Sequence, residues 1–182
     1  MSMNIVLTFS NYIHVYAMTS LGPKKLLVIM IRTAGYTIFF FSIVSGCLPG
    51  WHPFNNSCYH VSKEGESWMD GMKMCEMHGG YLVHIETAEE DNFITQQMRT
   101  YALHDLWMGG SDWTMEGTWV WEPEGRIFQY SNFAHGKPNN YHGENCLSKQ
   151  LSNNYRWDDD DCDEHMEYIC EKANTDIGSL VG

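Results

Sequence analysis

The sequence predicts one α+β domain cross-linked by disulfides, with an N-terminal leader and a short C-terminal tail. All six cysteines and all 23 acidic residues lie from residue 47 onward. Two stretches of that part have the apolar spacing of amphipathic helices. Its other apolar stretches are short and bounded by turn-forming residues, which is typical of β-strands. A chain of 182 residues is long enough for one such domain and an appendage.

Residues 1–46 are predicted to be a leader. A signal peptide that begins at Met30 would have one arginine, an apolar run over residues 36–44 and small residues just before Cys47. Residues 1–29 would then precede the true start of the protein. After either form of leader, the positive-inside rule places the rest of the chain outside the cytosol.

Two alternatives to the signal peptide stay open. Residues 26–46 are long enough to form a membrane anchor, but Arg32 would be costly within a bilayer. A buried core helix is the other alternative, and it lacks an upstream apolar segment to pack against. We therefore expect a secreted protein with no membrane segment in its mature form.

The charge and the cysteines of the remaining chain exclude several classes of protein. From residue 47 onward, eight basic residues stand against 23 acidic ones, a formal net charge of −15. Nucleic acids and anionic lipids need a cationic surface, so neither is expected as a partner. Six cysteines without any C-x-x-C pair favour three disulfides over a zinc site, and spacing alone leaves 15 pairings open.

The first half of the domain is predicted to contain a hairpin and a helix. Two cysteines within residues 47–61 are separated by Pro, Gly and Asn, which suits a small hairpin. This hairpin also holds a glycosylation acceptor sequence at Asn55, whose occupancy stays open. Trp68, Met72 and Cys75 then form one apolar helix face, which the glycines that follow would end.

A second helix and several short strands are expected after residue 80. Residues 81–85 read as a strand, and Thr87 with Glu90 forms a capping box that starts a helix. Its predicted buried side carries four apolar residues, Phe93, Ile94, Met98 and Tyr101. A strand, turn and strand are expected over residues 118–130, and a long loop over residues 131–145. Three closing strands are expected over residues 145–151, 155–162 and 166–172, and residues 173–182 are expected to be a frayed tail.

Several of these stretches together resemble the long-form C-type lectin-like domain, over residues 47–172. The most specific are GGYLVHIETAEEDNFI, LWMGGSD, GENC and RWDDDDC followed by YICE. The resemblance implies two helices flanking two small antiparallel sheets, with a long loop that carries the ligand site. It also implies three disulfide pairings: Cys47–Cys58, Cys75–Cys170 and Cys146–Cys162.

The resemblance further implies a calcium and sugar site in the long loop. In sugar-binding members, calcium is held by an E-P-N or Q-P-D loop, by a glutamate before the loop cysteine, and by W-N-D. The matching positions are Lys137, Asn139, Glu144, Asp158 and Asp159, with Pro138 at the turn. A second, weaker calcium site would use four side chains, Asp112, Glu116, Asn140 and Asn145, together with the Glu144 carbonyl.

Two positions depart from this pattern, because Lys137 replaces a glutamate or glutamine and Asp158 replaces an asparagine. A lysine ammonium is a donor only and cannot coordinate a cation. We expect Lys137 to turn its charge into water and Asp158 to supply the missing carboxylate. The calcium ligands would then be Asn139, Glu144, Asp158 and Asp159. A plain solvated acidic loop over residues 158–161 is the alternative.

The resemblance therefore implies a calcium-dependent carbohydrate-binding protein of the kind that recognises microbial glycans in innate immunity. Asn139 resembles the motif of members that bind mannose- or glucose-type sugars, and His135 and His142 in the loop could make binding sensitive to pH. The alternative is a calcium-independent domain that binds a protein, a lipid or a mineral surface. No H-E-x-x-H or G-x-S-x-G sequence is present, so an enzyme is not expected. The sequence sets no oligomeric state.

Overall fold

The computed structural model describes residues 13–19, 25–33, 36–44 and 46–174. Contacts divide the chain into two compact units. The first unit comprises residues 1–49 and 174–182, and the second comprises residues 50–173. The predicted tail, residues 173–182, lies outside the described residues from position 175 onward.

The described residues of the predicted leader form strands. β1 (Ile13–Thr19), β2 (Lys25–Thr33) and β3 (Tyr36–Val44) make a three-stranded antiparallel sheet in the order β1-β2-β3. The structure therefore has strands where an anchor or a core helix was considered. Within the described residues, no helix is long and apolar enough to cross a membrane. Whether this segment is removed as a signal peptide stays a prediction.

The second unit is built on one sheet of nine strands. Its main path is β11-β10-β7-β12-β5-β4, and every neighbouring pair on that path is antiparallel except the parallel pair of β12 and β7. The small strands β6 and β8 pair with β12 and β7, and β9 pairs with β8. The two sheets expected from the resemblance are thus hydrogen-bonded into one.

The strands of this unit agree with most of the expected ones. The hairpin is β4 (His52–Phe54) with β5 (Ser57–Glu66). The small strands are β6 (Tyr81–Leu82), β8 (Val120–Trp121) and β9 (Arg126–Ile127). The three closing strands are β10 (Cys146–Gln150), β11 (Arg156–Asp160) and β12 (Met166–Ala173). The strand that sequence reasoning missed is β7 (Asp105–Ser111), which lies near the middle of the sheet.

Both predicted helices are present with the predicted starts and faces. α1 (Trp68–Met77) buries Trp68 and Cys75, and the Ser67 side chain caps its first turn. α2 (Ala88–Tyr101) begins after Thr87, whose Oγ1 accepts a hydrogen bond from the Glu90 backbone N–H. Such a cap satisfies backbone donors that a helix start leaves unpaired. The apolar face of α2 packs against the larger of two core clusters, which includes Trp121 and Trp157.

The disulfides tie this fold together as the resemblance implied. Cys75–Cys170 links α1 to β12, and Cys146–Cys162 links the start of β10 to the residue shortly after β11. Cys47 and Cys58 are also disulfide-bonded, in agreement with the third pairing. No described cysteine is free.

Candidate functional site

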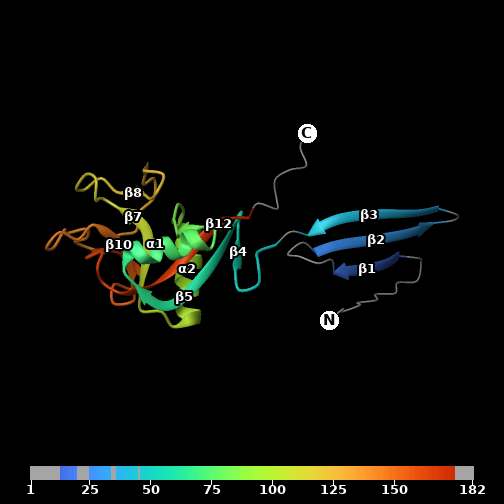
Figure 1. Cartoon of the computed structure of the whole chain (residues 1–182), viewed down its shortest axis with the longest axis horizontal. Helices are drawn as coiled ribbons and strands as arrows, with labels where there is room; N and C mark the ends of the chain where they lie inside the picture. The colour runs from blue at the N-terminus through green and yellow to red at the C-terminus, as the bar shows by residue number, and fades with distance from the viewer. Residues whose placement is uncertain (1–12, 20–24, 34–35, 45, 175–182) are drawn as a thin grey trace. The chain divides into compact units, whose positions relative to one another are not determined.

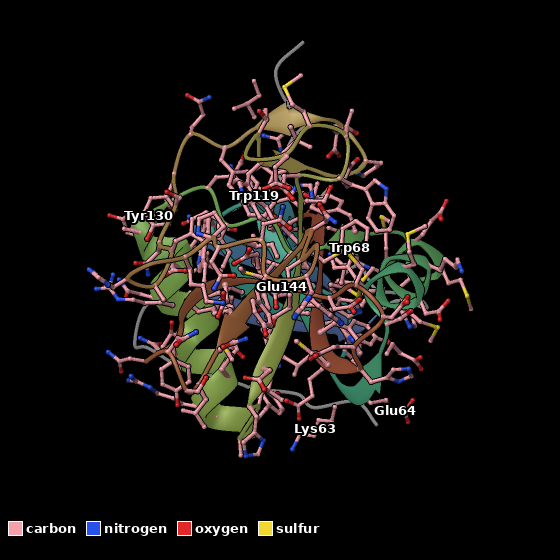
Figure 2. The ribbon with its side chains drawn as sticks, turned by 90° about the vertical axis from the view of Figure 1, so that its left-hand side faces the viewer. Lys63, Glu64, Trp68, Trp119, Tyr130 and Glu144 are labelled. Atoms are coloured by element: carbon pink, nitrogen blue, oxygen red, sulfur yellow. A yellow bond between two sulfur atoms is a disulfide. The ribbon has the colours of Figure 1, made fainter. Side chains whose placement is uncertain are left out.

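The long loop and three strand ends converge at one end of the second unit. In Figure 1 the yellow and orange segments between β7 and β10 extend from the end that lies away from β4. Figure 2 looks onto that end and labels Glu144 near its middle. β10 pairs with β11 so that Leu147 lies opposite Asp159 and Ser148 lies opposite Asp158. This register brings the two aspartates beside the end of the loop.

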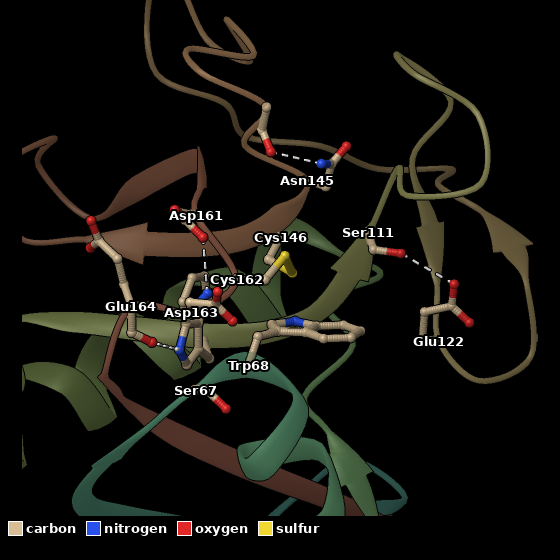
Figure 3. Close-up of a disulfide and its surroundings, with 12 residues drawn as sticks. Ser67, Trp68, Ser111, Glu122, Asn145, Cys146, Asp161, Cys162, Asp163 and Glu164 are labelled. Atoms are coloured by element: carbon tan, nitrogen blue, oxygen red, sulfur yellow. Dashed lines mark hydrogen bonds between the residues drawn. A yellow bond between two sulfur atoms is a disulfide. The ribbon is translucent and has the colours of Figure 1, made fainter.

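A short segment between β7 and the loop completes the site. Cys146 pairs with Ser111, the last residue of β7, and the Asp112 backbone N–H donates to the Asn145 carbonyl over 3.3 Å. The Cys146–Cys162 disulfide lies directly below Asn145, next to the indole ring of Trp68 (Figure 3). The predicted residues of the main site therefore come from the loop and from β11, and Asp112 and Glu116 of the second site come from the segment that follows β7.

Asp159 organises the backbone of the loop. Its side chain is fully buried, and its two carboxylate oxygens accept hydrogen bonds from the Asn139 backbone N–H over 2.9 and 2.8 Å. The Asn140 backbone N–H donates to the same carboxylate. The Lys137–Pro138 peptide bond just before these residues is cis. Asp159 thus holds the segment that carries the predicted sugar-binding residues.

The sequence led us to expect the Lys137 ammonium in water. In the structure it points into the site instead. Its ammonium Nζ lies 2.6 Å from Asp158 Oδ1 and 3.9 Å from Asp159 Oδ1, and its side chain is 23% exposed. Burial works to lower the pKa of Lys137, but the hydrogen bond and ion pair with Asp158 outweigh it, so the pKa is raised. The expectation of a solvated lysine is wrong because a buried carboxylate needs a charged or hydrogen-bonding partner.

Asp158 and Glu144 are two of the acids whose negative charges act on this ammonium. Asp158 is 3% exposed, and its carboxylate also accepts from Asn153 Nδ2 over 2.8 Å. Burial raises the pKa of Asp158, and Lys137 works against that shift. Glu144 is half-buried and accepts from the Tyr141 backbone N–H over 3.2 Å. Burial raises its pKa, and the nearby Lys137 charge lowers it. The three carboxylates of the predicted main site thus share one ammonium.

The residues of the predicted second calcium site also lie near one another. Asp112 is 2% exposed, and its Oδ2 accepts from the Gly117 backbone N–H over 2.8 Å. Its other oxygen, Oδ1, is buried with no hydrogen-bond partner. Asn140 Nδ2 donates to Glu116 Oε2 over 2.6 Å, and the negative charge of Asp159 acts on both Asp112 and Glu116. Burial is the main cause of the raised pKa of Asp112.

Asn145 and the two loop histidines make few contacts with the other site residues. The Asn145 side chain donates to the Gly143 carbonyl over 2.7 Å. His142 is exposed, with its ring 4.0 Å from that of Tyr141, and His135 is exposed at the start of the loop. Among the described residues, no three His, Cys, Asp or Glu side chains already lie close enough together to hold a metal ion. Amide and carbonyl oxygens would therefore have to complete either calcium site.

Sequence reasoning missed the buried network beneath the site. Asp91 on α2 accepts hydrogen bonds from Lys149 Nζ and Trp157 Nε1, each over 2.8 Å, and from Asn132 Nδ2 over 2.7 Å. It also missed Asp160, whose pKa burial raises to about 6. A lysine in a short closing strand gave no sign of burial, since strand lysines usually face water.

Comparisons with known proteins agree with this architecture. A family model described as the lectin C-type domain matches residues 46–172. A perlucin-like protein of Mytilus galloprovincialis is 35% identical over 146 residues, which cover 74% of this chain and 94% of the relative. The mouse scavenger receptor C-type lectin carbohydrate-recognition domain is 34% identical with a TM-score of 0.64, covering 70% of this chain and 98% of that one. A calcium-independent type II antifreeze protein is 26% identical with a TM-score of 0.64, covering 71% and 96%.

The matched region includes both helices, the long loop and all of the nine-stranded sheet except Ala173, the last residue of β12. The chain therefore belongs to the C-type lectin domain family and is a binding protein, not an enzyme.

Proposed function

We propose that the protein is an extracellular lectin that binds neutral glycans through the long loop, in the recognition of microbial or self glycans. The proposal is supported by the likeness to a carbohydrate-recognition domain and by the convergence of Asn139, Glu144 and Asp158 at one exposed end of the domain. Asn139 is exposed beside these acids and is the residue that favours mannose- or glucose-type sugars. Disulfides are typical of secreted proteins, which agrees with this location.

Calcium fits the group formed by Asp112, Glu116 and Asn140. The observation that carries this part of the proposal is the buried Asp112 Oδ1, which has no hydrogen-bond partner in the described structure. A buried carboxylate oxygen without a partner is costly, and calcium prefers carboxylate and amide oxygens. The Glu144 carbonyl and Asn145 would add further oxygens. Bound calcium would supply positive charge that offsets the mutual repulsion of Asp112, Glu116 and Asp159 and so holds the loop in place.

The main set of Asn139, Glu144, Asp158 and Asp159 fits calcium less well. Its three carboxylates have the right chemistry, but the Lys137 ammonium already lies against Asp158. We therefore propose that calcium binds at the Asp112 group in preference to the main set. Calcium at the main set stays a prediction that depends on Lys137 moving away.

The test is retention on mannose-agarose and galactose-agarose with calcium, with EDTA, and with calcium restored after EDTA. We expect retention with calcium, preferentially on mannose, and weaker retention with EDTA that calcium restores. Glu116→Gln should weaken the calcium effect, and Glu76→Gln, an exposed change on α1, should leave it unchanged. Absence of retention on both matrices under every condition would sink the proposal.

A second candidate function is calcium-independent binding of a mineral surface or a protein. The net charge of −15 from residue 47 onward favours it, since an acidic surface suits the cations of a mineral face. The ion pair between Lys137 and Asp158 also favours it, because it satisfies Asp158 without a metal. Adsorption to calcium carbonate, compared with retention on the two sugar matrices, separates this candidate from the glycan-binding one.

A further inference from the structure

We infer that the Lys137 ammonium is a tethered cation that takes the place of calcium at the main set, so that neutral sugar hydroxyls are bound there by Lys137 and Glu144 instead of by a metal ion. The inference rests on the proposed glycan site and specifies what occupies its centre. Three observations carry it: the position of the ammonium, the charge around it, and the donors it has left.

The position of the ammonium excludes a metal ion from the same carboxylate oxygen. Calcium would have to approach Asp158 Oδ1 to within about 2.3–2.6 Å, and Lys137 Nζ already lies 2.6 Å from that atom. Asp158 is 3% exposed, and it also accepts hydrogen bonds from Asn153 Nδ2 and from the Asp159 backbone N–H, which are neutral donors. In the described residues, the ion pairs of Asp158 and Asp159 are both formed with Lys137. Asp158 is therefore paired without a metal.

The surrounding charge decides which ligands suit the site. The carboxylates of Glu144, Asp158 and Asp159 outnumber the single ammonium of Lys137, so the site stays negative at neutral pH. Sialylated or sulfated glycans would be repelled, because like charges at short range disfavour binding. Neutral sugars carry hydroxyl groups that both donate and accept, which matches a mixed set of one ammonium and several carboxylates.

The N–H groups of Lys137 that do not contact Asp158 can donate hydrogen bonds to a sugar. An ammonium has three N–H groups, and Asp158 Oδ1 accepts one of them. Asp159 Oδ1, at 3.9 Å, is beyond hydrogen-bond distance. The side chain is 23% exposed, so a remaining N–H can donate to a sugar hydroxyl from solvent. The neighbouring hydroxyl can donate to Glu144, which is half-buried and accepts a hydrogen bond from the Tyr141 backbone N–H.

The experiment counts calcium ions per molecule by native mass spectrometry and by equilibrium dialysis at about 1 mM calcium, near the affinity of weak extracellular sites. It compares the wild type with Lys137→Glu, which adds a ligand, and with Lys137→Met, which only removes the charge. Asp112→Asn is made in the wild type and in Lys137→Glu to remove the other site. Thermal melting of each variant establishes that it is folded.

We expect one calcium in the wild type and two in Lys137→Glu, with Lys137→Met also gaining an ion at higher calcium. Asp112→Asn should leave no ion in the wild-type background and one in the Lys137→Glu background. Two ions in the wild type, an equal count in the wild type and Lys137→Glu, or an ion that survives Asp112→Asn in the wild type would overturn the inference.

The outcomes separate this inference from the proposed function. No ion in the wild type and one in Lys137→Glu would support the tethered cation while removing calcium from the Asp112 group. Loss of retention on both sugar matrices would remove the glycan proposal, and the ion counts would still decide whether Lys137 excludes calcium. For the sugar itself, wild type should bind neutral glycans on an array, and preferential binding of sulfated or sialylated glycans would overturn the ligand class.

Discussion

Replacing Lys149 by methionine should destabilise the domain far more than a typical single substitution. Lys149 is fully buried in β10, and its ammonium pairs with Asp91 Oδ1 over 2.8 Å. Burial lowers the pKa of Lys149, and Asp91 is the charge that opposes the shift. Asp91 also accepts from Trp157 beside the aspartates of the site and from Asn132 at the start of the loop. The pair therefore joins α2, β10, β11 and the loop.

The size of the effect follows from leaving one charge buried without its partner. Removing one member of a buried ion pair costs about 3–5 kcal/mol. Lys149→Met and Asp91→Asn should each cost about this much, which corresponds to roughly 10–20 °C in melting temperature for a unit of this size. The double variant leaves no unpaired charge, so it should cost only about 1–3 kcal/mol, chiefly from weakened hydrogen bonds to Trp157 and Asn132.

The assay is urea unfolding of the wild type, both single variants and the double variant, with the disulfides kept oxidised. The double-mutant cycle should give a coupling free energy of about 3–9 kcal/mol between Lys149 and Asp91, which is the sum of the two single costs less the cost of the double variant. Lys73→Met is the matched control, because Lys73 forms an exposed i,i+3 pair with Asp70 and surface pairs contribute little. A cost for Lys149→Met as small as that of the control, or strictly additive single effects, would refute the reasoning.

Three further outcomes are expected. Burial raises the pKa of Glu171 from 4.5 to about 7, so its neutral form favours folding. The contribution of Glu171 to the free energy of unfolding should then be fully present at or below about pH 4.5 and fall by about 3 kcal/mol as pH rises through 7. Glu171→Gln should flatten that fall in urea titrations at several pH values, and Glu76→Gln should not. Replacing Cys75 and Cys170 together by serine should cost about 4–5 kcal/mol, because the bridge closes a loop of 95 residues, and an unchanged urea midpoint would contradict this. Lys137→Glu should move glycan-array binding towards mannose in the presence of calcium, and an unchanged array would show that residue 137 does not select the sugar.

The helices and the disulfide framework were predictable because local rules decide them. The spacing of Trp68, Met72 and Cys75 and the capping box at Thr87 need only neighbours in the sequence to act. The disulfide pairings came from the resemblance, since spacing alone allowed many connections. The three closing strands were also predicted at the positions where the structure has them.

β7 was missed because it contains Gly109 and Gly110, and glycine is unfavourable in a strand. The close packing around β7 nevertheless requires glycine at both positions. A side chain at Gly109 would meet the Leu82 carbonyl oxygen at 2.5 Å, and one at Gly110 would meet Phe128 and Leu147. Glycine weakens a strand when it is judged from the sequence alone. Here it allows the central strand to lie against its neighbours, and that contact is visible only in three dimensions.

The site residues were predictable as a set, but their arrangement around Lys137 was not. The sequence identified a lysine that could not bind calcium and an aspartate that replaced an amide. It gave no sign that Asp158 would be buried and would take the lysine as its partner. Burial of a charge depends on the register of β10 and β11, which no local pattern determines.

The central claim is that the long loop binds a neutral sugar, and a backbone NMR titration tests it most directly. Isotope-labelled protein with calcium is titrated with methyl α-mannoside and, as a comparison, with methyl galactoside. The account predicts chemical-shift changes concentrated at the amides of residues 137–145 and 158–159, larger for the mannoside. Changes centred elsewhere on the domain, or none with either sugar, would contradict it.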